Sequence, residues 1–171
     1  MASSRYLISS TTVSGTTTAS VAFSSIPSGY TDLCVKISVR ANSGGSNANG
    51  LRLTINGSSA NQSSTNVYGD GSAAGSTRGA TYIMTSAADG SSATANTFSN
   101  VELYIPSYTA SQNKPISRVS GQEDNVTTPA YIYADARLWS STSAITDLSF
   151  DISGSNLASG STFTLYGLKN S

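Results

Sequence analysis

The sequence contains no histidine and only one cysteine, Cys34, among its 171 residues. Histidine is the usual general base at neutral pH, the common partner of serine and cysteine nucleophiles, and the commonest zinc ligand. Its absence argues against these catalytic arrangements and, with a single cysteine, against a structural zinc site. One cysteine also excludes an intrachain disulfide. Cys34 lies in a strand-like run with only Lys36 as a nearby base, so we expect a partly buried apolar side chain rather than a reactive thiol.

Charged residues are scarce, at 11% of the chain, and the nine basic residues balance nine acidic ones. They are scattered along the sequence and form no basic stripe of the kind that binds a phosphate backbone, so we expect no nucleic-acid partner. No apolar run approaches the roughly 18 to 20 residues that span a bilayer. The N-terminal stretch MASSRYLISSTTV has no apolar block typical of a signal peptide. We therefore expect no membrane partner.

Hydrophobic residues make up 37% of the chain and fall in short, organised blocks, which favours a folded domain over disorder. A chain of this length is enough for one domain that buries roughly two-thirds of its unfolded surface without a disulfide or a metal. We see no linker or charge run that would divide it. Residues 1–171 are therefore expected to form a single domain.

Apolar and polar residues alternate with period two, as in half-buried strands. In residues 32–40 the apolar positions are Leu33, Val35, Ile37 and Val39. The other strand candidates are residues 5–13, 19–25, 51–56, 80–85, 101–105, 116–121, 131–139, 145–152 and 161–168. Turn signals such as Asn56-Gly57 separate them, and residues 41–50 and 57–79 are expected to be long polar connections. The pattern predicts an all-β, antiparallel β-sandwich of eight to ten strands, with the jelly roll as its expected form.

Residues 131–139 carry the densest aromatic pattern. Their alternation assigns Ile132, Ala134, Ala136 and Leu138 to the core and the opposite phase to the exposed side. An exposed row of aromatic and charged residues is typical of a subunit interface or a sugar platform. The alternative is a central strand packed on both sides, which would bury the row inside the fold. The candidate partner interface consists of Tyr131, Tyr133, Arg137 and Trp139.

Two further motifs are weak candidates for chemistry. A glycoside hydrolase needs two carboxylates across a cleft, and only Glu123 and Asp124 are adjacent acids, in a loop where solvation is favoured and calcium binding is a remote alternative. Residues 69–75 look superficially like a phosphate-binding glycine loop, but their spacing is wrong and they lie inside a polar connection, so we expect a flexible turn. The sequence predicts no catalytic, cofactor-binding or metal-binding residues, and we expect a protein that is not an enzyme.

Two stretches carry a resemblance to a known group. They are residues 25–33 (SIPSGYTDL), and residues 144–148 (AITDL) leading into residues 157–168 (LASGSTFTLYGL). They resemble small, β-rich virion structural proteins of tailed bacteriophages, many from marine or cyanobacterial phages. The resemblance suggests a particle component and carries over no catalytic or cofactor residues.

Of the particle components, we expect a capsid decoration (cement) protein on the outer capsid surface of the virion. It would bind and stabilise the lattice of the major capsid protein, and we expect a homotrimer. The alternative is a receptor- or glycan-binding module of a phage tail fibre or adhesin. A polysaccharide-degrading enzyme is a third reading.

Overall fold

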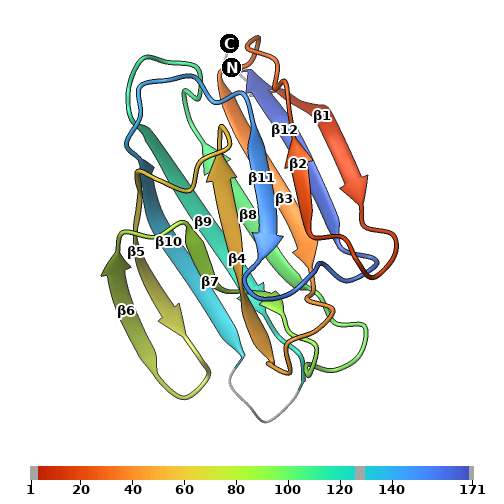
Figure 1. The fold of residues 1–171 in the computed structure, drawn as a ribbon. Coiled ribbons are helices and arrows are strands. Elements are labelled where there is room, and N and C mark those ends of the chain that lie inside the picture. The colour runs from red at the N-terminus through yellow and green to blue at the C-terminus, as the bar shows by residue number, and fades with distance from the viewer. Residues whose placement is uncertain (1–3, 126–129, 170–171) are drawn as a thin grey trace.

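The computed structural model describes residues 4–125 and 130–169, which contain twelve strands and no helix (Figure 1). The strands are β1 (Ser4–Thr12), β2 (Ser20–Phe23), β3 (Asp32–Val39), β4 (Ala48–Ile55), β5 (Gln62–Gly69), β6 (Ala74–Gly79), β7 (Ile83–Asp89), β8 (Ser99–Ile105), β9 (Lys114–Gln122), β10 (Tyr131–Trp139), β11 (Leu148–Ile152) and β12 (Thr162–Lys169).

The strands form two antiparallel sheets. The larger has eight strands in the order β1-β12-β3-β8-β9-β10-β5-β6, and the smaller has four in the order β2-β11-β4-β7. In Figure 1 the smaller sheet lies in front of the larger one, so that the two form the layers of a sandwich. The predicted all-β, antiparallel sandwich is confirmed, whereas the more specific expectation of a jelly roll is not.

The core lies between the two sheets and follows the predicted alternation in most strands. Leu33, Val35, Ile37 and Val39 of β3 are all buried, at 4% exposure or less. Phe150 of β11 packs against aromatic rings from both layers, with ring centroids 6.3 Å from Phe23 and 5.8 Å from Phe163. Offset and edge-on ring pairs of this kind add to the free energy gained by burying apolar surface.

The hairpin of β5 and β6 was not predicted. Residues 57–79 were expected to be a polar connection, but they add two strands to the edge of the large sheet and raise the strand count above the expected eight to ten. The inward side chains of β5 are Gln62, Ser64 and Asn66, which are buried although polar. The outer side of β5 has only Val67 as a large apolar residue, so neither side shows the recurring apolar positions that period-two analysis detects.

Candidate interaction surface

β10 faces the opposite way from the prediction. Tyr133, Arg137 and Trp139 are each 5% exposed, and they lie on the side of β10 that faces the small sheet. Tyr131, at the start of the strand, is half-buried, whereas Ile132 on the other side is 62% exposed. The expectation that this row is exposed is therefore wrong. The row lies inside the fold and cannot serve as a sugar platform on the surface.

The buried side of β9 and β10 holds an ion cluster. One oxygen of Asp135 lies 3.0 Å from Nη2 of Arg118, and the other lies 3.2 Å from Nη1 of Arg137. All three side chains are at most 2% exposed. Burial lowers the pKa of Arg118 to about 10, and the neighbouring Asp135 opposes that decrease. Two guanidinium groups thus share one carboxylate in the interior, and their remaining N–H groups need other acceptors.

Three acceptors come from β7, at the edge of the small sheet, and from Thr81 just before it, whereas Nε of Arg118 and of Arg137 has no hydrogen-bond partner among the described residues. β7 is the last strand of the small sheet, so the carbonyl groups that point away from β4 have no neighbouring strand. Arg137 donates from Nη2 to the carbonyl of Thr81 at 2.9 Å and from Nη1 to that of Ile83 at 3.4 Å. Arg118 donates from Nη1 to the carbonyl of Thr85 at 3.2 Å. The arginines face inward because they satisfy carbonyl groups that would otherwise be buried without a donor.

The aromatic residues of the row stabilise this layer. The ring of Tyr133 stacks on that of Tyr68 at a centroid distance of 5.2 Å, and the Arg118 guanidinium lies 4.9 Å from the Tyr133 ring centroid. Counting apolar area instead of apolar residues would have favoured the correct orientation. Each large aromatic side chain buries about 150–250 Å², far more than the alanines at positions 134 and 136 on the other side of β10.

Lys114 joins two loops at one end of the sandwich. Its side chain is fully buried, and Nζ donates to the carbonyl groups of Ala110 at 2.7 Å, Gln112 at 2.5 Å and Ser143 at 2.9 Å. The ammonium also lies 5.9 Å from the centroid of the Trp139 ring. A buried lysine needs this many acceptors because the ammonium group has lost its hydration. Sequence reasoning did not single out Lys114, and no spacing motif marks it.

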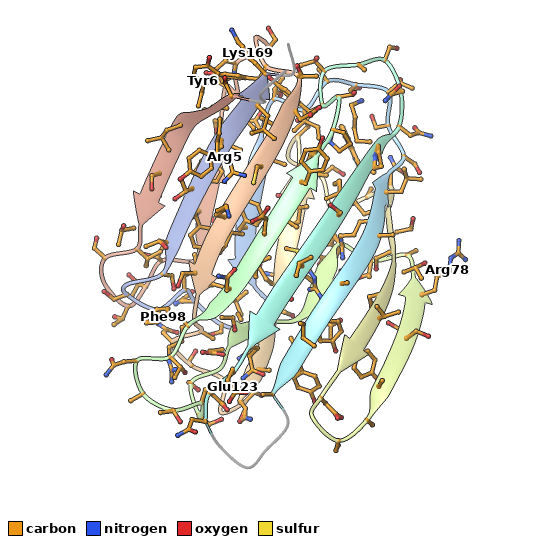
Figure 2. The ribbon with its side chains drawn as sticks, turned by 180° about the vertical axis from the view of Figure 1, so that it is seen from behind. Arg5, Tyr6, Arg78, Phe98, Glu123 and Lys169 are labelled. Atoms are coloured by element: carbon orange, nitrogen blue, oxygen red, sulfur yellow. The ribbon has the colours of Figure 1, made fainter. Side chains whose placement is uncertain are left out.

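The side of the large sheet that faces away from the small sheet lacks the charged residues found on the buried side of β9 and β10. Over β9, β10 and β5 its side chains are uncharged, and most are apolar or small. This surface, called the outer patch below, comprises Pro115, Ser117, Val119, Gly121, Ile132, Ala134, Ala136, Leu138, Ser63, Thr65, Val67 and Gly69. Figure 2 views the large sheet from this side.

Three branched aliphatic side chains dominate the outer patch. Val67 and Val119 are each 58% exposed and Ile132 is 62% exposed. Open grooves run on both sides of Ile132, one toward Val67 and Ala74 and the other toward Tyr104. Contiguous exposed apolar surface of this kind is typical of a site that contacts another molecule. The residue pattern did not predict this surface, because Ile132 was assigned to the core and Val67 to a polar connection.

The two weak chemical motifs are explained by local structure. Asp70 lies in the turn between β5 and β6, where Oδ1 accepts from the backbone N–H groups of Ser72 and Ala73 at 2.9 and 2.6 Å. Residues 70–73 are thus a turn organised by an aspartate, and the flanking residues of the 69–75 stretch belong to β5 and β6. The stretch contains a turn and opens no helix, but it joins two strands instead of lying inside the expected polar connection. The Glu123 carboxylate is exposed and accepts from the backbone N–H of Asn125 at 2.9 Å. Asp124 is buried at 0% exposure, so the expected solvation holds for Glu123 and is wrong for Asp124. Among residues 4–125 and 130–169, no group of three or more potential metal ligands is found.

Cys34 is buried on the outer side of β3, at 1% exposure, between the paired residues Tyr104 and Tyr166. Burial raises the pKa of its thiol, and the nearby Glu102 carboxylate adds to that increase. A thiol reacts as its thiolate, so a raised pKa makes it a poor nucleophile at neutral pH. The predicted burial of Cys34 is confirmed.

Comparisons of the chain with protein-family models, with curated proteins and with solved structures found no match. Among the described residues, no helix has the length and apolar character needed to cross a membrane.

Proposed function

We propose that this chain is a non-enzymatic structural subunit of a phage particle, and specifically a capsid decoration protein that binds the lattice of the major capsid protein. The observation that carries the proposal is the outer patch. In the middle of the large sheet, β9 and β10 direct their charged side chains inward, where they hold the two layers together, and present an uncharged, largely apolar surface to solvent. Such a surface supports a role in assembly, because its burial requires no charge to be desolvated.

The resemblance of residues 25–33, 144–148 and 157–168 to virion proteins of tailed phages supports the assignment to a particle. The fold suits this use, since a sandwich of this size folds on its own and leaves sheet faces and loops available for contacts with neighbours. The glycan-binding alternative was based on an exposed aromatic row. It is weakened because Tyr133 and Trp139 lie inside the fold.

The number of copies of this chain in purified particles tests the proposal. Quantitative mass spectrometry against the major capsid protein should give a ratio typical of a shell component, with copies in the hundreds. A few copies per particle would assign the chain to the tail instead, and its absence from purified particles would contradict a structural role.

A further inference from the structure

We infer that a second copy of this chain packs on the outer patch, with β10 and β9 of one copy facing β5 and β6 of the other. The inference rests on the proposed role as an assembly subunit, and it names the partner of the outer patch. In a closed dimer each copy would make this contact in both directions.

The charges around the outer patch favour a partner with the same surface. The outer patch itself carries none, so a charged ligand gains nothing over its area. One side is bordered by Glu102 on β8, whose carboxylate lies 2.7 Å from Nζ of Lys36 and remains 44% exposed. The other side is bordered by Arg78 on the edge strand β6, which makes no ion pair with any described residue (Figure 2).

The strand register determines how these border charges would meet. Glu102 is level with Val119 and Val67, and Arg78 is level with Ser117 and Thr65. The two levels are two residues apart, about 7 Å along the strands, a distance that an arginine side chain can span. When β9 of one copy faces β6 of the other, Glu102 of the first lies beside Arg78 of the second. If β10 of one copy instead faced β9 of the other, β6 would lie over β3 and Arg78 would approach Lys36, which has the same charge. The charges therefore favour the contact between β10 and β5 over the contact between β10 and β9.

The sizes of the side chains fit the same arrangement. Ile132 is paired with Gly69 on one side and with Gly121 on the other, so it stands between two hollows. A Cβ atom at Gly121 would meet nothing within 4 Å. One level along, the small Ala134 lies between Val67 and Val119. With β10 over β5, Ile132 of one copy faces Gly69 of the other, and Ala134 faces Val67. Large side chains thus oppose small ones, which is what close packing of two sheets requires.

The extent of the contact sets its expected strength. From β9 to β6 the surface is about 14 Å wide, and its outward residues span about 20 Å along the strands. This projected area is well below the roughly 800 Å² that each partner buries in a stable interface of standard size. The free chain should therefore associate reversibly and in a concentration-dependent way. On the particle, contacts with neighbouring subunits would strengthen this association.

Sedimentation velocity over a wide concentration range tests the inference on the purified chain. The average mass of the wild type should rise with concentration toward that of a dimer. Ile132→Asp should raise the dissociation constant roughly 30-fold or more, the effect of losing one anchor residue. The matched control is Leu7→Asp, because Leu7 on the edge strand β1 of the same sheet is also 62% exposed and lies outside the outer patch. Circular dichroism melts should show that both variants stay folded.

A charge exchange tests the arrangement itself. Glu102→Arg and Arg78→Glu should each weaken association, and the double variant should recover most of it. A wild type that stays monomeric at every concentration would overturn the inference. So would association that survives Ile132→Asp, or that Leu7→Asp abolishes equally.

Binding to purified particles separates this inference from the proposed function. If the chain is monomeric in solution but Ile132→Asp abolishes its retention on particles, the outer patch contacts another virion protein. The self-association inference is then wrong while the proposed function survives. If the chain associates as described but purified particles contain none of it, the proposed function fails and the contact between copies stands.

Discussion

Replacing Asp135 by asparagine should destabilise the fold strongly, although the side chain keeps its shape. Among the residues that the structure describes, Asp135 provides the only carboxylate within 3.2 Å of the buried guanidinium groups of Arg118 and Arg137, and the change removes it. Leaving a buried charge without its counter-charge costs about 3–5 kcal/mol. With an unfolding entropy of about 2.1 cal/mol/K per residue, the 171-residue chain unfolds with about 360 cal/mol/K. The melting temperature should therefore fall by about 8–14 °C.

The assay is thermal unfolding followed by circular dichroism, in dilute protein so that self-association does not contribute. Glu102→Gln is the matched control, because it removes the same charge from an ion pair of 2.7 Å whose members are 44% and 47% exposed. An exposed pair contributes at most about 1 kcal/mol, so the control should lower the melting temperature by less than about 3 °C. Equal shifts for Asp135→Asn and Glu102→Gln would refute the reasoning, since the interior cluster would then be as well solvated as a surface pair.

Three further predictions concern single side chains. Lys114→Met should lower the free energy of unfolding, measured by urea titration, by at least about 2 kcal/mol, because the carbonyl groups of two loops lose their common donor. The control Lys169→Met, at an exposed position, should lower it by less than about 1 kcal/mol. Trp139→Ala should destabilise the isolated chain by about 3–5 kcal/mol, reversing the expectation drawn from an exposed row; an unchanged urea midpoint would contradict the buried position. Cys34 should not react with Ellman's reagent at pH 8 in the folded chain, because burial raises the pKa of its thiol. It should react fully in denaturant. Rapid labelling of the folded chain would show that the thiol is accessible.

The sequence predicted strands in which apolar residues recur on at least one side. In β3 the alternation of Leu33 to Val39 marks both the strand and its buried side, and the structure agrees. The prediction failed at β5, whose inward residues Gln62, Ser64 and Asn66 are polar. Hydrophobic periodicity detects a strand only where apolar residues recur on one side, and the outer side of β5 has a single large apolar residue, Val67.

The orientation of β10 could not be predicted from the sequence for a related reason. Both sides of this strand carry apolar atoms, so alternation indicates a strand without indicating which side is covered. The arginines at positions 118 and 137 are inside because carbonyl groups of β7 and of Thr81 just before it accept their hydrogen bonds, and those groups lie between 33 and 56 residues away in the chain.

The all-β class, most strand positions and the turns thus follow from composition and from neighbours in the chain, as does the lack of histidine chemistry. Which residues of β9 and β10 are buried, and which form the outer patch, is settled only when the two sheets pack together. That choice is set by the strand that covers them, since a charge can be buried only where folding brings its hydrogen-bonding partners to it.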